Sequence, residues 1–259
     1  MSFLETLGKA IGGFILTLCL ISLIFTYGFA EITNYNSLKP VFTDITTNQL
    51  NAVGNPDQLK TLIEQQCLLS DKLNIPFDNT SLDINCADIQ QSDDMTKYLS
   101  GQLFDAFYNK EYDCSVIDCL TTAMQTKNPQ DLTILVSAKM HSFLQTLIIF
   151  FIAGIIAGLA IIIVSLRQLF SILKTIGIAM IVSGLSFIII LVMKFMVPVS
   201  QNSLLGFVEN IMNMFIILYA IVFAIGVILF IAGWYKTRKS TKRKELEKPK
   251  TIHKNKKNK

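Results

Sequence analysis

Charged residues are scarce in this sequence. Asp, Glu, Lys and Arg make up 16% of the 259 residues, whereas about a quarter of an ordinary soluble domain is charged. Four long windows contain no Asp, Glu, Lys, Arg or His at all. The shortage of charge indicates that much of the chain avoids water.

Residues and motifs that carry common enzyme chemistry are also few. The sequence has two histidines, His141 and His253, and it lacks the GxSxG, HExxH, P-loop and GxGxxG patterns. The four uncharged windows also lack the ionisable group that ion-coupled transporters usually carry within the membrane. We therefore expect no catalytic, cofactor or metal site, and we expect that the protein is not an enzyme.

Each uncharged window is long enough to cross a lipid bilayer. A hydrocarbon core about 30 Å thick requires about 20 apolar residues in a helix. A helix also satisfies every backbone polar group internally, and the windows lack the alternating polarity of barrel strands. The sequence therefore predicts four transmembrane helices, at residues 11–30, 142–166, 175–193 and 211–235.

Acidic and basic residues are separated along the chain. Residues 31–140 contain 15 Asp or Glu and seven Lys, a net charge of −8, whereas residues 236–259 contain 12 Lys or Arg and two Glu, a net charge of +10. Basic residues that flank membrane spans stay on the cytoplasmic side. This rule predicts a protein of the plasma or cell membrane with residues 1–10, 167–174 and 236–259 in the cytoplasm. Residues 31–140 and 194–210 then lie outside.

The first window leaves two alternatives open. The small residues of Gly28-Phe29-Ala30 lie where a signal peptidase cleaves, before Glu31. The apolar stretch is longer than a usual signal-peptide core, which favours a retained signal anchor. Cleavage would reduce the number of spans to three.

The segment 31–140 carries the signals of a small helical domain. We expect helices to begin near Pro56, Ser92, Ser115 and Pro129, where capping residues or a first-turn proline occur. The last of these helices is expected to continue without a break into the second span. The turn-rich stretch 74–91 is expected to form a loop.

The apolar residues that follow Pro56 recur at helical spacing. They are Leu59, Leu62, Ile63, Cys67 and Leu69. Such a stripe usually faces a core. The predicted fold class is an all-α membrane protein: four transmembrane helices, with a small disulfide-stabilised helical ectodomain between the first and the second.

Four of the five cysteines fall in this segment, at Cys67, Cys86, Cys114 and Cys119. An even number in an oxidising compartment predicts two disulfides. If Ser115 caps a helix, Cys114 and Cys119 occupy the contacting N′ and N4 positions, so 114–119 with 67–86 is possible. The pairing of 67–119 with 86–114 stays open. A zinc site is the rival interpretation, although no C-x-x-C and no neighbouring histidine support it.

Asn79-Thr80-Ser81 is an N-x-S/T triplet on the side predicted to lie outside, in the predicted loop. Asn79 is therefore a possible glycosylation site. Such triplets also arise by chance.

Small residues recur four apart in the predicted spans and allow close helix approach in lipid. We assign helix packing to Gly154, Gly158, Gly184, Ala220 and Ala224. Packing within the four-helix bundle is one interpretation, and pairing with a partner helix is the other.

The basic tail is expected to be disordered, to keep the C-terminus inside and to attract anionic lipid headgroups. The residues expected to face the lipid are Lys236, Arg238, Lys239, Lys242, Arg243 and Lys244. Because the tail lacks interleaved aromatic residues, we do not expect nucleic-acid binding.

The leading functional hypothesis is a non-catalytic membrane protein whose ectodomain binds or organises a membrane or extracellular protein partner, or a second copy of itself. An oligomeric channel or transporter subunit is an alternative. A membrane thiol–disulfide oxidoreductase is a third, although the sequence lacks the C-x-x-C pair common in such enzymes.

Overall fold

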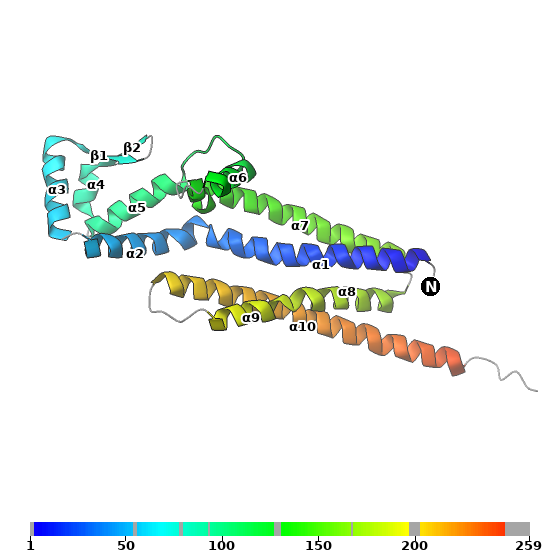
Figure 1. Ribbon diagram of the computed structural model, residues 1–259. Coiled ribbons are helices and arrows are strands. Elements are labelled where there is room, and N and C mark those ends of the chain that lie inside the picture. The colour runs from blue at the N-terminus through cyan, green and yellow to red at the C-terminus, as the bar shows by residue number, and fades with distance from the viewer. Residues whose placement is uncertain are drawn as a thin grey trace, which may run out of the picture. The chain divides into compact units, whose positions relative to one another are not determined.

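The computed structural model describes residues 3–53, 56–77, 80–92, 94–126, 131–166, 168–196 and 203–246. The described chain is mostly helical (Figure 1). Its elements in chain order are α1 (Phe3–Ile32), α2 (Tyr35–Val53), α3 (Pro56–Leu69), β1 (Lys72–Phe77), β2 (Thr80–Asn85), α4 (Cys86–Gln91), α5 (Met95–Tyr108), α6 (Val116–Thr126), the 3₁₀ helix η1 (Asp131–Val136), α7 (Ala138–Ser165), α8 (Leu169–Gly184), α9 (Ser186–Met196) and α10 (Ser203–Leu246).

Four helical stretches are long and apolar enough to cross a membrane, as the sequence predicted. They are Glu5–Ile32, Ala138–Ser165, Leu169–Val192 and Glu209–Lys236. Each begins before its predicted window, because a helix can continue through polar residues next to its apolar part. The protein therefore has the architecture of a multi-pass integral membrane protein.

The third of these stretches is not one continuous helix, contrary to expectation. α8 ends at Gly184 and α9 begins at Ser186, with a turn at Leu185 between them. The Ser183 hydroxyl donates to the carbonyl of Ala179 at 2.7 Å. A serine that bonds back to the preceding turn bends a helix, and Gly184 weakens the helix further.

The chain divides into two compact units. Unit 1 comprises residues 1–24, 151–190 and 216–259, and unit 2 comprises residues 25–150 and 191–215. The core of unit 1 contains Leu16, Ile162, Leu166 and Ala179.

Glycines bring two helix pairs of unit 1 into backbone contact. A Cβ added at Gly158 of α7 would lie 3.2 Å from the nitrogen of Leu16 in α1. A Cβ at Gly177 of α8 would lie 2.6 Å from the nitrogen of Phe230 in α10, and a Cβ at Gly226 of α10 would lie 2.8 Å from the nitrogen of Ile181 in α8. These helices pack this closely because glycine has no side chain.

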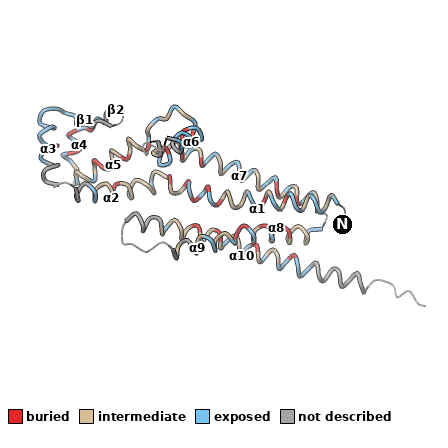
Figure 2. The backbone as a smooth tube through the Cα atoms, in the orientation of Figure 1, coloured by how far each residue is buried: buried red, intermediate tan, exposed pale blue. Residues whose placement is uncertain are grey.

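Unit 2 contains two apolar clusters. Figure 2 marks the buried positions along the backbone in red. The first comprises Ile63, Leu73, Ile84, Cys86, Ile89 and Leu99, and is called the groove cluster below. The second comprises Ala30, Val116, Cys119, Ile134, Met140 and Leu144. Both clusters combine residues that are far apart in sequence.

The helix α2 was not predicted from the sequence. It begins after Asn34, whose side-chain oxygen accepts a hydrogen bond from the backbone nitrogen of Asn36 at 2.9 Å. Its aromatic residues pack on fully buried Phe104 of α5, with ring centroids 5.5 Å away for Tyr35 and 5.3 Å away for Phe42. The apolar positions of α2 are too few to predict a helix from the sequence alone, because the pattern depends on packing against α5.

Residues 74–77 and 80–91 are not a loop, which corrects the all-α expectation. β1 and β2 form an antiparallel hairpin in which buried Leu73 pairs with buried Ile84, and α4 follows. Pro76 favoured a loop, but both strands of a two-stranded sheet are edge strands, where proline is tolerated. The described part of the domain is therefore helical with one hairpin.

The predicted continuous helix from Pro129 into the second span is also wrong. Residues 131–136 form the 3₁₀ helix η1, and α7 starts separately at Ala138. The hydroxyl of fully buried Ser137 donates to the carbonyl of Ile134 at 2.7 Å and accepts from the nitrogen of Met140 at 3.2 Å. Ser137 therefore caps the new helix. Pro129 itself lies outside the described residues.

Two of the other predicted helix starts are confirmed, at Pro56 and Ser115. The start predicted near Ser92 lies later in the chain, because Ser92 itself ends α4. α3 begins at Pro56. Asp94 caps α5 by accepting from the nitrogen of Lys97 at 3.0 Å. Ser115 caps α6 by accepting from the nitrogen of Asp118 at 3.2 Å. These signals are local, so they could be predicted without knowledge of the tertiary fold.

The start of the basic tail is helical rather than disordered. α10 continues past the apolar window as far as Leu246. Similarly, α8 begins at Leu169, so most of the predicted loop 167–174 is helix. Residues 247–259 lie outside the described part of the chain.

Candidate functional site

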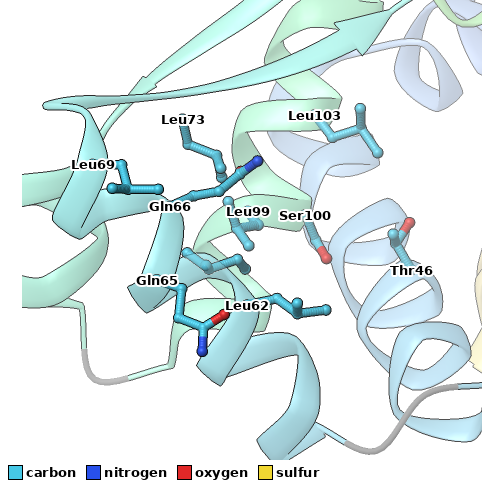
Figure 3. A pocket seen from close by; sticks show the side chains of 10 residues that line it. Thr46, Leu62, Gln65, Gln66, Leu69, Leu73, Leu99, Ser100 and Leu103 are labelled. Carbon is cyan, nitrogen blue, oxygen red and sulfur yellow. The ribbon is translucent and has the colours of Figure 1, made fainter.

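The clearest candidate site is an apolar groove in unit 2, formed by α2, α3, β1 and α5. Its volume is about 580 Å³, within the range of known ligand pockets. Figure 3 shows the side chains that line it. The lining residues are Thr46, Leu62, Ile63, Gln65, Gln66, Leu69, Leu73, Leu99, Ser100 and Leu103.

The floor of the groove belongs to the groove cluster. Ile63, Leu73 and Leu99 are buried there, and each comes from a different element. The hydroxyl of Ser100 is held by a hydrogen bond to the carbonyl of Thr96 at 2.8 Å. The floor is therefore fixed by packing and by a satisfied polar group.

Two leucines of α3 lie at the groove with most of their surface uncovered. Leu62 is 62% exposed and Leu69 is 89% exposed. This corrects the expectation that the whole stripe after Pro56 faces a core. Of Leu62, Ile63 and Leu69, only Ile63 is buried, because no element covers Leu62 and Leu69 at the groove.

A disulfide anchors the α3 wall of the groove. Cys67 of α3 is paired with Cys86 at the start of α4, with Cα atoms 5.5 Å apart. Both cysteines pack in the groove cluster. The crosslink therefore fixes α3 against the hairpin and α4.

The lining of the groove is suited to binding rather than to chemistry. It combines six leucine or isoleucine side chains with two hydroxyls and two amides, and none of the ten residues is charged. These ten described residues thus supply no general acid, base or nucleophile pair. An uncharged apolar segment would fit it.

A second hollow, of about 860 Å³, lies between α2 and α5. Lys39 in this hollow donates to the hydroxyl of Tyr35 at 2.6 Å and to both carboxylate oxygens of Asp105 at 2.9 Å. Burial by itself lowers the pKa of Lys39. The hydrogen bonds to Tyr35 and Asp105 and the charge of Asp105 raise the pKa by more than burial lowers it, so the pKa of Lys39 lies above its usual value. Lys39 is thereby held as a structural cation.

The second cysteine pair lies apart from the groove. Cys114 is paired with Cys119 across the start of α6, with Cα atoms 5.6 Å apart. Lys139 of α7 donates to the carbonyls of Tyr112 and Cys114, each at 2.6 Å. Of the two pairings that the sequence left open, the structure contains 67–86 with 114–119.

The predicted packing residues occupy different environments. Gly154 and Gly158 face α1, where a Cβ on Gly154 would meet the sulfur of Cys19. Gly184 faces Phe223 of α10, with a Cβ 2.6 Å from its Cα. Ala220 is half-buried and Ala224 is exposed.

Sequence reasoning missed Gly12, Gly177, Gly226 and Gly233, each of which contacts a neighbouring helix backbone. Their contact partners come from distant parts of the chain. The signal available in the sequence was their spacing of seven residues from Gly177 to Gly184 and from Gly226 to Gly233.

None of the other predicted site residues that the structure describes lines the groove. Asn79 falls outside the described residues. Lys236 lies over the ring of Phe170, 5.0 Å from its centroid. Arg238, Lys239, Lys242, Arg243 and Lys244 belong to the helix α10.

Comparison of the chain with models of known protein families, with curated proteins and with solved structures finds no match. The site must therefore be interpreted from its own geometry and chemistry.

Proposed function

We propose that this protein is a non-catalytic membrane protein with four spans, whose domain of residues 31–140 lies outside the cytoplasm and binds a protein partner through the apolar groove. The single observation that carries this proposal is the uncovered leucine pair at the groove. Leu62 and Leu69 are 62% and 89% exposed beside a cavity of about 580 Å³.

Uncovered apolar surface of this kind is costly in water. Burial of apolar surface is favourable by about 25 cal/mol per Å², and exposed apolar patches commonly mark interaction sites. A partner that covered Leu62 and Leu69 would recover this energy. The groove floor is already packed, so little reorganisation is required before binding.

The lining indicates the chemistry of the partner. Because none of the described residues that line the groove is charged, they would leave a buried charge on the partner unpaired, which is expensive. The partner segment is therefore apolar at its centre. Amide groups of Gln65 and Gln66 can bond to its backbone or to its neutral polar side chains.

Topology supports this placement of the domain. The tail of residues 236–259 has a net charge of +10 and is held in the cytoplasm by the positive-inside rule. Four crossings then put the acidic segment 31–140 on the other side. An external protease applied to intact cells should cut within 31–140 and leave an epitope on the tail intact.

The groove is tested by charge insertion. Full-length protein carrying both Leu62→Glu and Leu69→Glu is expected to recover at least tenfold less of its co-purifying partner in mild detergent than wild type does. The matched control is Leu68→Glu. Leu68 is 84% exposed on the same helix but does not line the groove, so this variant should retain the partner.

Two tagged copies in one cell distinguish a different partner from self-association. Capture of the second tag would identify the partner as another copy of this chain. Equal recovery with the groove variant and with wild type, or a chain that stays monomeric without any partner, would overturn the proposal.

A further inference from the structure

Two lysines of unit 1 lie over aromatic rings from each other's helix. The Nζ atom of Lys236 in α10 is 5.0 Å from the ring centroid of Phe170 in α8. The Nζ atom of Lys174 in α8 is 5.9 Å from the ring centroid of Phe230 in α10. Both separations are within the range of cation–π attraction. We call these four residues the lysine clasp.

The clasp is built on a backbone crossing. A Cβ added at Gly233 of α10 would lie 2.8 Å from the nitrogen of Lys174 and 2.9 Å from the carbonyl oxygen of Phe170. Lys236 follows Gly233 by three residues, which places it close to the same helix face. The crossing therefore holds both lysines at one end of the α8–α10 pair.

These two positive charges have little nearby compensation. Among the unit 1 residues whose side chains the structure describes, Glu5 is the only acidic one, and neither Lys174 nor Lys236 forms an ion pair with a described carboxylate. The chain from residue 167 to residue 244 contains only one acid, Glu209. Glu209 belongs to unit 2 and pairs with Lys194 at 3.2 Å.

The surroundings favour a lipid over a free ion. Lys236 ends the candidate span Glu209–Lys236, and Lys174 lies in the first part of the span Leu169–Val192. Large apolar side chains at these helix ends are exposed, among them Leu169, Trp234 and Tyr235. An anion bound there would have apolar surface beside it, as a phospholipid requires.

We propose that Lys174 and Lys236 together bind the phosphate of an anionic phospholipid. The rings of Phe170 and Phe230 position the two ammonium groups, and the phosphate supplies a negative charge to two lysines that pair with no described carboxylate. This site differs from diffuse attraction by the basic tail, because it requires two particular residues on two helices. It is also independent of the groove.

The test uses full-length protein in neutral detergent and measures the binding of fluorescent phosphatidic acid against fluorescent phosphatidylcholine. Wild type should bind phosphatidic acid saturably at one site. Lys174→Gln with Lys236→Gln should weaken this binding about tenfold or more, since each basic residue contributes about fivefold. Lys239→Gln with Lys242→Gln removes the same amount of charge from the tail. This control variant should weaken the binding of phosphatidic acid less than threefold.

Two further arms keep the proposal falsifiable. Lys174→Arg with Lys236→Arg keeps both charges and should retain binding, and loss of binding in this folded variant would overturn the proposal. Equal weakening of phosphatidic acid binding by the glutamine variant of the lysine clasp and by that of the tail would show diffuse attraction. This result would also overturn the proposal. Inorganic phosphate should compete poorly; competition at the same concentration as the lipid would assign the site to free phosphate instead.

Discussion

The Nδ1 atom of His141 lies 3.0 Å from the carbonyl oxygen of Ala30, and so joins the first turn of α7 to the last turn of α1. Because a carbonyl can only accept, Nδ1 carries the proton in this bond. The amide nitrogen of Gln145 lies 2.9 Å from Nε2, which accepts. The hydroxyl of Thr33 donates to the same carbonyl at 3.2 Å, so His141 is a second side-chain donor to this helix-end carbonyl.

Replacement of His141 by Ala is expected to lower the stability of the full-length protein by about 1 kcal/mol, because the Ala30 carbonyl loses one of its two side-chain donors. The apparent melting temperature in mild detergent should fall by about 2–4 °C. Gln145→Ala serves as the control, because Gln145 is exposed and its bond reaches only the neighbouring turn. Similar losses in the two variants would contradict the proposed role of the His141–Ala30 contact.

Lys39→Met is expected to destabilise the protein in a pH-dependent manner. The pKa of Lys39 in the fold is raised above its usual value of 10.5 by Tyr35 and Asp105, despite the opposing effect of burial. A raised pKa means that the stabilisation is fully present below about pH 10.5 and is lost as the pH rises through the folded-state value. Since the pair is about one-third exposed, we expect a loss of only about 0.5–1 kcal/mol at pH 8.

The measurement compares thermal unfolding of wild type and Lys39→Met at pH 8 and above pH 11. The difference between the proteins should shrink at the higher pH. Lys97→Met is the control, since Lys97 is exposed and forms no ion pair with a described residue. A difference that stays constant with pH would contradict the role of the Lys39 charge.

Gly177→Ala is expected to separate α8 from α10, because the added methyl would lie 2.6 Å from a backbone atom that cannot move independently. Overpacking of this kind costs about 1–3 kcal/mol. Gly13→Ala is the matched control in α1, where the nearest atom to the added methyl lies at 3.8 Å. Melting in detergent should show a clear loss for the first variant and none for the second.

Removal of the Cys67–Cys86 disulfide by paired serine substitutions should cost more than removal of Cys114–Cys119. The two crosslinks close chain separations of 19 and five residues, for which loop-closure entropy predicts losses of about 3 and about 2 kcal/mol. Loss of the Cys67–Cys86 disulfide should also reduce the recovery of the partner, because this disulfide anchors the groove wall. Peptide mapping without reductant checks the pairing directly, and recovery of 67–119 and 86–114 peptides would contradict it.

Several features could be predicted because their causes are local. A bilayer requires an unbroken apolar window of fixed length, so the four spans follow from composition alone. The starts of α5 and α6 follow from Asp94 and Ser115, which bond within three residues of themselves. No knowledge of the tertiary structure is needed for either inference.

The predictions for other features were wrong because the causes of those features are not local. The hairpin depends on the pairing of Leu73 with Ile84 across the strands. The start of α7 depends on the buried Ser137, whose cap competes with continuation of the preceding turn. In each case a weak local preference for loop or helix was outweighed by contacts made elsewhere in the fold.

The sequence by itself determined that this chain has four apolar spans and an acidic, cysteine-bearing segment between the first and second, because hydropathy and charge are properties of the residues in order. Only the tertiary structure decided which cysteines pair, which glycines meet another helix, and that Leu62 and Leu69 stay uncovered beside buried Ile63. Burial and contact are relations between residues distant in the chain, so the periodicity of one helix cannot determine them.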